Sequence, residues 1–300
     1  MKIDITIIIP IYKNEHVLNQ CLNSLKKALL KSKLSVEYIF IVNDPAFKKT
    51  LYIFPKGANI IFNTENLGFA KGINSGAAHA GGNWLLLVNA DTVFKPSSLA
   101  EVQPYLKSKS TAMIVPKLLN KDGSLQYNLI AEPTLCNLLI EQSYLYKLLP
   151  EIFRHPQSDK RLYKHSGEVN FASGCNVFIN KKVFKDLGGF DERFFLYFED
   201  TDFCHRLKKT SYKIIYNPGS VMVHLRHQSH GGNFPVDKYT NSLFLYLCKY
   251  HSRSYVKLYL IFLLLGQTAR YFFLSVTGKL HAKNNDYLKG LFTIRKFLLS

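Results

Sequence analysis

The sequence has few acidic residues and lacks paired cysteines. Its 300 residues include 39 Lys and Arg but only 21 Asp and Glu, so the formal net charge is +18. The five cysteines are scattered without a Cys-x-x-Cys pair, which argues against a disulfide framework or a zinc module and indicates a reducing compartment. The apolar run at residues 5–11 is short and contains Pro10, so we expect a buried first strand rather than a signal peptide.

Acidic residues are scarcest in the C-terminal part of the chain. After Asp202 the only ones are Asp237 and Asp286, against many Lys and Arg. Such a surface suits nucleic acid, anionic lipid or a phosphorylated substrate. The sequence contains no C₂H₂, KH or RNP-type motif, so we do not expect nucleic acid as a partner. The cations alternate with long apolar stretches, which favours a membrane surface.

Residues 239–300 predict long aromatic and aliphatic helices with basic edges. Residues 258–266 are nearly all apolar, but Lys257 and Arg270 limit the charge-free stretch to about a dozen residues. That is fewer than the ~18 residues that span a bilayer, so we expect a helical region lying in the membrane interface. The alternative is a buried C-terminal helix that packs on the domain.

The first 238 residues alternate strand and helix patterns, which predicts an α/β domain with a mostly parallel sheet and helices on both faces. The expected strands are residues 5–11, 36–42, 60–62, 84–88, 113–115, 168–179, 212–216 and 221–224. The expected helices are residues 17–31, 68–80, 96–107, 138–148, 181–187 and 199–209. Residues 121–166 form an irregular excursion of the kind that shapes a substrate site. We therefore divide the chain into a domain at 1–238 and a helical region at 239–300.

Asp91 is the first candidate for site chemistry. The sequence Asn89-Ala90-Asp91 follows the apolar run at residues 84–88, and open α/β sheets bind ligands at the carboxyl ends of their strands. Hard cations such as Mg²⁺ or Mn²⁺ bind carboxylate, phosphate and water oxygens, so one carboxylate and a nucleotide diphosphate would suit them. The alternative role for Asp91 is a helix cap ahead of Pro96.

An acidic cluster a hundred residues later is the second candidate. Glu199 and Asp200 follow the apolar residues 194–198, which would exclude water from them. Burial raises the pKa of a carboxyl group and suits it to act as a general base. The alternative is capping of the helix at residues 199–209. For Asp202 we expect a cap or a supporting contact.

Three other features lie at the ends of predicted elements. Asn66 and Gly68 open a helix with glycines four residues apart, a stripe that allows close approach to the sheet or to an anionic ligand. Asn43 and Asp44 end a strand, where they would either contact a nucleobase or ribose or form a simple turn. His224 ends another strand and is the first of three histidines spaced by three, with His227, His230 and a glycine pair after it.

Taken together, residues 3–232 resemble glycosyltransferase family 2, the inverting nucleotide-sugar transferases of GT-A fold, and most closely the bacterial rhamnosyltransferases and related cell-surface polysaccharide enzymes. Each motif is short, but their order and spacing are specific. The motifs are Ile9-Pro10-Ile11-Tyr12, Asn66-Leu67-Gly68-Phe69 with Gly72 and Asn74, Asn89-Ala90-Asp91, Ser173-Gly174, Gly188-Gly189-Phe190-Asp191-Glu192, residues 195–202, and His224 with Ser229.

The resemblance implies a role for each matching position. Asp200 would be the base that deprotonates the acceptor hydroxyl, with Glu199 helping to position it. Asp91 would bind the metal ion, Mg²⁺ or Mn²⁺, on the donor diphosphate, and His224 would add a metal or diphosphate contact. The donor nucleotide and diphosphate would lie against Pro10, Tyr12, Glu15, Asn43, Asp44, Asn66, Gly68, Lys71, Asn74 and Asn89.

Two departures from the family pattern affect these roles. The family usually has Val-Asp-Asn at the second strand, whereas Val42-Asn43-Asp44 reverses the polar pair, so the side chain that meets the base stays open. The metal motif reads Asn-Ala-Asp where Asn-Pro-Asp or Asp-x-Asp is commoner, which leaves Asp91 as the expected ligand.

The expected function is transfer of a sugar from a UDP- or dTDP-linked donor to a glycan or lipid-linked acceptor. The enzyme would be cytoplasmic and peripheral on the inner face of the cell membrane. Two rival functions remain open. One is a catalytically silent relative that binds a nucleotide sugar or a glycan. The other is a nucleotidyltransferase, which would normally have a basic Gly-rich phosphate loop near the first strand, unlike Tyr12-Lys13-Asn14-Glu15.

Overall fold

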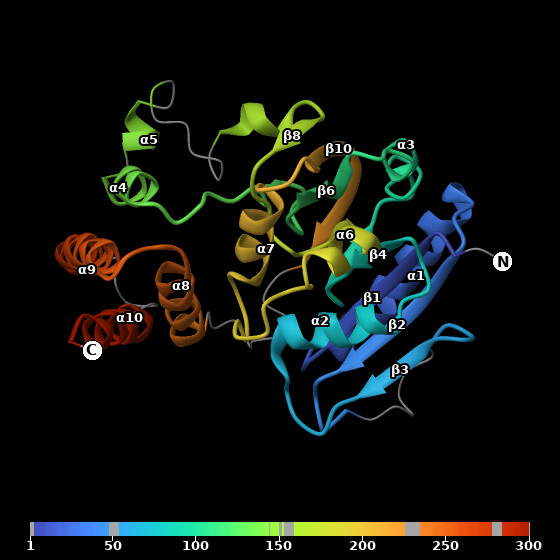
Figure 1. Ribbon diagram of the computed structural model, residues 1–300, viewed down its shortest axis with the longest axis horizontal. Helices are drawn as coiled ribbons and strands as arrows, with labels where there is room; N and C mark the ends of the chain where they lie inside the picture. Colours follow the sequence, from blue (N-terminus) through green and yellow to red (C-terminus); the bar gives the residue numbers. More distant parts are fainter. Residues whose placement is uncertain are drawn as a thin grey trace. The chain divides into compact units, whose positions relative to one another are not determined.

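The computed structural model describes residues 3–47, 54–143, 145–149, 152, 159–225, 235–277 and 284–299 (Figure 1). The chain forms two compact units. Unit 1 comprises residues 1–130, 160–195 and 199–233, and unit 2 comprises residues 131–159, 196–198 and 234–300. The second unit therefore includes a segment of the irregular excursion as well as the C-terminal helices. The predicted boundary between residues 238 and 239 stays a prediction.

Unit 1 is built on one mixed sheet whose strand order is β3-β2-β1-β4-β9-β6-β10-β5. The strands on this path are β1 (Ile5–Ile11), β2 (Val36–Val42), β3 (Asn59–Phe62), β4 (Trp84–Leu87), β5 (Thr92–Phe94), β6 (Thr111–Leu119), β9 (Val177–Asn180) and β10 (Lys213–His224). Two short strands, β7 (Leu125–Gln126) and β8 (Gly167–Val169), pair with β6 and β10. Strands β1 to β4 run parallel, and β9 runs antiparallel to both of its neighbours.

Alternating side chains of the central strands supply a core on each face of the sheet. Along β1, Ile8 packs in one cluster while Ile7 and Ile9 pack in the other. The Ile8 cluster is covered by α2 (Gly68–Ala78), α6 (Lys181–Asp186) and α7 (Glu199–Leu207), and the other by α1 (Glu15–Ser32) and the segment leading into α3 (Gln103–Leu106). Helices on both faces bury a mostly parallel sheet, as the sequence pattern predicts.

Several predicted elements have different bounds. The strand predicted at 168–179 is wrong, because β8 and β9 are separate and Asn176 between them has φ +57°, which breaks an extended strand. The helix predicted at 96–107 shortens to α3, since the Ser98 hydroxyl bonds the Lys95 carbonyl in the preceding turn. The strands predicted at 212–216 and 221–224 form the single strand β10, which is irregular between Asn217 and Val221.

Unit 2 is helical. Its helices are α4 (Leu135–Ser143), α5 (Leu145–Leu148), α8 (Val236–Tyr250), α9 (Arg253–Val276) and α10 (Asn284–Leu299). The helix predicted at 138–148 overlaps α4 and α5. Among the described residues, α9 is the one helix long and apolar enough to cross a membrane by length and composition alone. Counting only its charge-free stretch led us to expect a shorter apolar segment.

Candidate active site

The sheet topology brings the predicted site residues to one edge. Parallel strands β1, β2 and β4 end at this edge with Tyr12, Asn43 and Asn89 just beyond them. Strands β4 and β6 are both antiparallel to β9 and therefore run in the same direction. Strand β10 is parallel to β6, so His224 at its end lies at the same edge. The loop at residues 173–176 precedes β9 and also lies here. Open α/β sheets bind ligands at this edge.

Asp91 and His224 form a buried pair at this edge. His224 Nε2 lies 3.2 Å from Asp91 Oδ1, and the Leu225 amide donates to the Asp91 carbonyl at 2.9 Å. Burial lowers the pKa of His224, but the Cys175 sulfur 3.7 Å away and the Asp91 carboxylate outweigh burial and raise the pKa to about 10. The ring is therefore protonated at neutral pH when it pairs with Asp91 alone, and a cation bound here would have to displace that proton.

The pair also fits a divalent cation. Two adjacent ligands of an octahedral ion at ~2.1 Å lie ~3.0 Å apart, close to the observed 3.2 Å. A carboxylate oxygen and an imidazole nitrogen suit Mn²⁺, and the carboxylate suits Mg²⁺. Within the described part of the chain, no group of three or more His, Cys, Asp or Glu side chains is arranged to hold a metal. A cation at Asp91 and His224 would need its remaining ligands from a diphosphate and water.

Asn176 holds the turn that carries Asp91. Its side chain is fully buried, and its Oδ1 accepts hydrogen bonds from the Asn89 amide at 3.2 Å and the Thr92 hydroxyl at 2.7 Å. The neighbouring Cys175 sulfur accepts from the Asn89 side-chain amide at 3.2 Å. Sequence reasoning missed Asn176, although an asparagine inside a predicted strand is a signal for a left-handed backbone position.

The same loop contacts the second carboxylate, Asp200. The Gly174 amide donates to Asp200 Oδ2 at 2.7 Å, and the Thr201 amide donates to Asp200 Oδ1 at 2.7 Å. A Cβ on Gly174 would lie 3.2 Å from the Asp200 Cβ, so the absence of a side chain allows this close contact. Burial raises the pKa of Asp200, and these hydrogen bonds lower it by less. Asp200 keeps part of its surface exposed, as a base that meets a substrate must.

Glu199 differs from Asp200 in its surroundings. It is 4% exposed, and its Oε2 has no hydrogen-bond partner among the described residues. Burial first, and then the charge of Asp200, raise the pKa of Glu199 well above its ordinary value. Burial therefore raises the pKa of both carboxyl groups, and the Asp200 charge raises that of Glu199 further.

The backbone before this pair is strained. Tyr197 and Phe198 have φ values of +69° and +65°, in the left-handed region that residues other than glycine rarely adopt. Strain of this kind is found at functional sites, where the surrounding structure holds it in place. The strained residues belong to the apolar lead-in that the sequence predicts as a desolvating segment.

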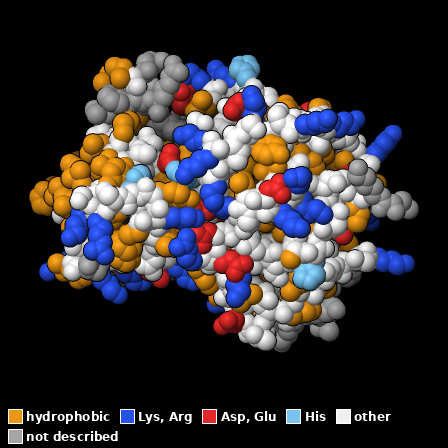
Figure 2. Space-filling view, in the orientation of Figure 1, with side chains coloured by type: hydrophobic (Ala, Val, Ile, Leu, Met, Phe, Trp, Pro, Cys, Tyr) orange, Lys and Arg blue, Asp and Glu red, His pale blue; other side chains and the backbone are white. Residues whose placement is uncertain are grey.

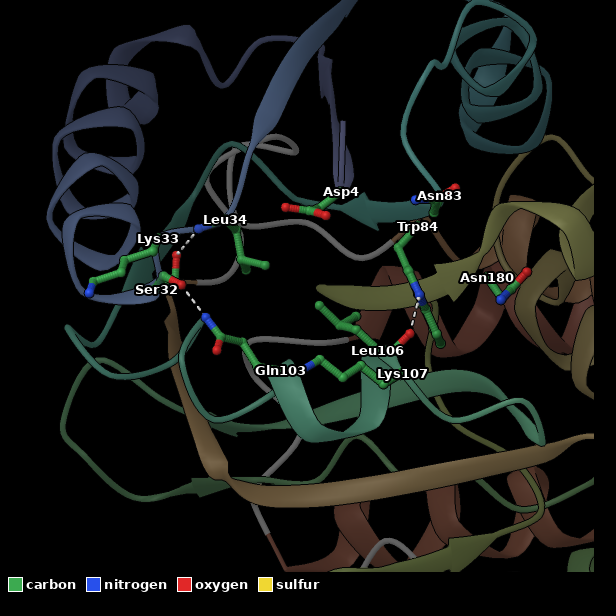
Figure 3. Close-up of a pocket in the computed structure, with 10 residues that line it drawn as sticks. All are labelled: Asp4, Ser32, Lys33, Leu34, Asn83, Trp84, Gln103, Leu106, Lys107 and Asn180. Atoms are coloured by element: carbon green, nitrogen blue, oxygen red, sulfur yellow. Dashed lines mark hydrogen bonds between the residues drawn. The ribbon is translucent and has the colours of Figure 1, made fainter. Parts of the chain in front are cut away.

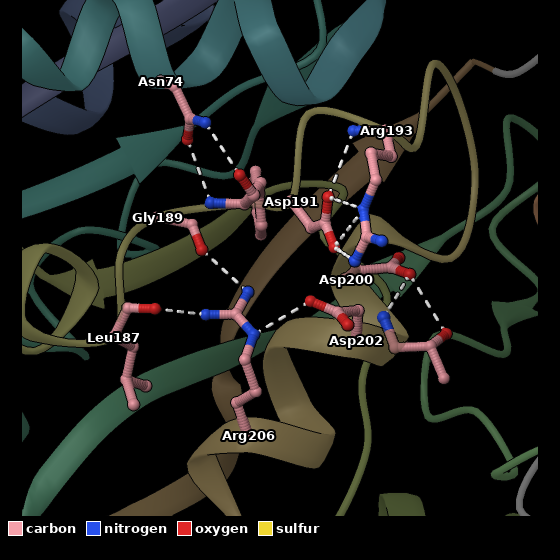
Figure 4. A network of polar contacts seen from close by, with 10 residues as sticks. Asn74, Leu187, Gly189, Asp191, Arg193, Asp200, Asp202 and Arg206 are labelled. Atoms are coloured by element: carbon pink, nitrogen blue, oxygen red, sulfur yellow. Dashed lines mark hydrogen bonds and ion pairs between the residues drawn. The ribbon is translucent and has the colours of Figure 1, made fainter. Parts of the chain in front are cut away.

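Polar contacts brace the loop that precedes this helix (Figure 4). The Arg206 guanidinium pairs with the fully buried Asp202 at 2.9 Å and donates to the carbonyls of Leu187 and Gly189. The Asn74 side chain bonds both the amide and the carbonyl of Phe190. Asp202 is thus a structural partner of Arg206, in agreement with the supporting contact expected for it.

The proposed nucleotide residues are held by one another. Asn43 donates to the Gly68 carbonyl at 3.0 Å and accepts from Asn63 at 2.8 Å. Gly68 has φ +80°, and a Cβ there would lie 2.3 Å from the Phe195 carbonyl oxygen, so this position requires glycine. Its amide donates to the Asn66 side chain. These contacts tie the ends of β2 and α2 to the segment that leads toward Asp200.

The remaining predicted residues lie at the same edge with fewer contacts. Asp44 accepts from the Ala46 amide, Pro10 and Tyr12 are half-buried, and Lys71 is exposed. The Glu15 side chain lies outside the described part of the structure, as do Ser229 and the other histidines and glycines of residues 226–234.

A pocket of about 540 Å³ lies elsewhere in unit 1 (Figure 3). Asp4 and Trp84 at the starts of β1 and β4, and Asn180 at the end of β9, are among the residues that line it. It is therefore at the opposite edge of the sheet and contains none of the predicted site residues. Its polar groups bond within the protein, as the Trp84 indole does with the Leu106 carbonyl.

The chain is similar to known proteins in sequence. The family model for Glycosyl transferase family 2 matches residues 6–188, and a model for the N-terminal domain of galactosyltransferase matches residues 154–228. The N-acetylglucosaminyl-diphospho-decaprenol L-rhamnosyltransferase of Mycobacterium tuberculosis is 26% identical over 213 residues, which cover 67% of each chain. Rhamnosyltransferase WbbL of Escherichia coli is 22% identical over 154 residues, which cover 51% of this chain and 56% of WbbL.

Solved structures share the fold. GalNAc-T7 with UDP, GalNAc and Mn²⁺ matches with a TM-score of 0.56 at 17% identity, over 80% of this chain and 47% of that chain. Residues 1–349 of S. aureus TarS match with a TM-score of 0.53 at 14% identity, over 97% of this chain and 80% of that chain. The chain thus spans about half the length of the GalNAc-T7 chain. The likeness confirms the predicted GT-A architecture.

Proposed function

The chain belongs to glycosyl transferase family 2 and is a glycosyltransferase related to rhamnosyltransferases, and from that premise we propose a specific reaction. The enzyme transfers a hexose or deoxyhexose from a UDP- or dTDP-linked donor to a hydroxyl of a glycan or lipid-linked acceptor. The configuration at the sugar's anomeric carbon inverts. The product is a cell-surface polysaccharide or its lipid-linked precursor.

One observation carries this proposal. The loop at residues 173–176 bonds Asp200 through the Gly174 amide and bonds the Asn89–Asp91 turn through Cys175 and Asn176. A single loop therefore ties a carboxylate suited to proton transfer to an Asp–His pair suited to a cation. Inverting transfer requires these two functions next to each other, one on the acceptor side of the sugar and one on the diphosphate side.

Asp200 performs the proton transfer in this reaction. The acceptor oxygen forms a bond to the anomeric carbon while the bond from that carbon to the diphosphate oxygen breaks. Asp200 takes the acceptor proton, and the nucleoside diphosphate leaves with the bonding electron pair. The Gly174 and Thr201 amides hold the Asp200 carboxylate in place. General-base help of this kind contributes on the order of 10²–10⁴-fold in rate.

Asp91 and His224 hold the diphosphate side. They would bind Mg²⁺ or Mn²⁺, which when bound neutralises charge on the leaving diphosphate. The nucleotide would lie against Pro10, Tyr12, Glu15, Asn43 and Asp44, and the sugar diphosphate against Asn66, Gly68, Lys71, Asn74 and Asn89. The structure of GalNAc-T7, which has the same fold, contains UDP and Mn²⁺, and this supports a nucleoside diphosphate and a divalent cation as ligands.

Unit 2 would hold the enzyme on the inner face of the cell membrane. Large apolar side chains are exposed along one face of α9, opposite the face that packs through Val256 and Leu260. These exposed side chains are Leu258, Ile261, Phe262, Leu265, Phe272, Phe273 and Val276. Figure 2 shows apolar side chains gathered over α9 with Lys and Arg beside them. Basic residues around an apolar helical face favour anionic lipid, and a lipid-linked acceptor would be found there.

Replacement of Asp200 tests the reaction. Asp200→Asn removes the base without changing the shape of the side chain, so nucleoside diphosphate release from UDP- and dTDP-hexoses, with lipid extract as acceptor, should fall by at least 10²-fold. Asp186→Asn removes an exposed carboxylate from α6 and should transfer normally. Full transfer by Asp200→Asn would remove Asp200 from its role. Donor binding by the wild type without any transfer would indicate a catalytically silent relative.

A further inference from the structure

The two ring nitrogens of His224 face different partners. Nε2 faces Asp91, while Nδ1 lies 3.0 Å from the side-chain amide of Gln126. Gln126 ends β7, whose pairing with Leu118 of β6 fixes its backbone, and its side chain is buried. A buried polar group on the far side of a histidine from its ligand commonly fixes the proton on the ring.

The Gln126 amide has two possible orientations, because its oxygen and nitrogen ends have the same shape. With the nitrogen toward His224, Gln126 Oε1 has no hydrogen-bond partner among the described residues. With the oxygen toward His224, it accepts the Nδ1–H and leaves the Nε2 lone pair free.

We infer that Gln126 is a positioning residue for metal binding. Its carbonyl oxygen accepts the Nδ1–H of His224 and directs the Nε2 lone pair toward the cation held with Asp91. The inference rests on the proposed function, because it presumes that Asp91 and His224 bind a divalent cation on the donor diphosphate. Contacts of this kind typically change metal affinity by 10–100-fold.

Two substitutions separate this role from packing. Gln126→Leu keeps most of the buried volume but removes the acceptor, so it should weaken Mn²⁺ binding by about 10–100-fold. Gln126→Glu has a similar shape and offers only acceptor oxygens when ionised. This variant should therefore bind Mn²⁺ at least as tightly as the wild type. If the glutamine instead donates to Nδ1, the proton of the neutral ring lies on Nε2, and Gln126→Leu should not weaken Mn²⁺ binding.

The readout is Mn²⁺ affinity by electron paramagnetic resonance of free Mn²⁺, in the presence of saturating UDP and separately of dTDP. Gln103→Leu is the matched control, since this glutamine lies on α3 at the opposite edge of the sheet (Figure 3) and should leave the affinity unchanged. Equal Mn²⁺ affinity of Gln126→Leu and wild type overturns the inference, as does loss of affinity in Gln126→Glu. Absence of Mn²⁺ binding by the wild type with either nucleotide would instead count against the proposed metal site.

Discussion

The buried ion pair between Asp202 and Arg206 predicts a large loss of stability on Asp202→Asn. The Asp202 side chain is 0% exposed and the Arg206 side chain 21%, and their charged atoms lie 2.9 Å apart. Breaking a buried pair by removing one partner costs about 3–5 kcal/mol, because the other charge stays buried without compensation. Arg206 keeps the Leu187 and Gly189 carbonyls as partners, so we expect about 3 kcal/mol. That is a large part of the ~5–15 kcal/mol that stabilises a folded domain.

A matched exposed pair provides the control. Lys182 and Asp186 on α6 have the same i,i+4 spacing, with side chains 76% and 49% exposed. Solvent screens an exposed helical pair of this kind, so Asp186→Asn should leave the free energy of unfolding nearly unchanged. The contrast between the two variants therefore isolates the effect of burial.

Urea unfolding followed by tryptophan fluorescence measures both variants. Trp84 is the only tryptophan in the chain and lies buried in β4, so its fluorescence reports on unit 1. Asp202→Asn should move the midpoint well below that of Asp186→Asn at an unchanged slope. An equal, small shift for both variants would show that the Asp202–Arg206 pair does not support the fold.

Three further predictions concern pH and the membrane. Burial raises the pKa of Asp200, so kcat/KM should fall on acidification with a midpoint above ~3.9, the pKa of an ordinary aspartate. A fall in kcat/KM centred at about pH 3.9 would contradict this prediction. The pKa of Glu199 is raised in the folded state, so its ionisation opposes folding as the pH rises from ~4.3 toward that pKa. Glu199→Gln should therefore make unit 1 more stable to urea at neutral pH, and this gain should disappear below pH ~4.3. Equal stability of the variant and the wild type at neutral pH would refute this prediction. The double variant Leu265→Lys/Phe272→Lys on α9 should reduce sedimentation with anionic vesicles several-fold. The control Leu30→Lys replaces an exposed leucine on α1 and should not reduce it. Undiminished sedimentation of the double variant would place the membrane contact elsewhere.

The sheet and its functional edge could be predicted from the sequence because their signals are local. Apolar runs such as residues 84–88 and 36–42 end in polar residues, and parallel strands bring their carboxyl ends together. The position of Asp91 on the edge follows from that rule. The rhamnosyltransferase-like family assignment follows from the order of the motifs and is confirmed by the family match.

The contacts that organise the site could not be predicted, because they join residues far apart in the chain. Asn176 bonds Asn89 across 87 positions, and Gln126 meets His224 across 98. No periodicity in a single sequence indicates which polar side chains will meet in this way. The left-handed backbone at Asn176 also depends on the buried contacts that its side chain makes, so local propensity favoured one continuous strand at residues 168–179.

The most direct test of the proposed donor site is the gain in stability of unit 1 when a nucleotide is added. Trp84 fluorescence reports this stability during urea unfolding. Wild type, Asp91→Ala and Asp200→Asn would each be measured with UDP, dTDP and GDP, with and without Mn²⁺. A ligand at a hundred times its Kd stabilises a protein by about 2.7 kcal/mol. We expect a Mn²⁺-dependent gain in stability with UDP or dTDP in the wild type and in Asp200→Asn, and none in Asp91→Ala. No gain with any nucleotide, or an undiminished gain in Asp91→Ala, would contradict it.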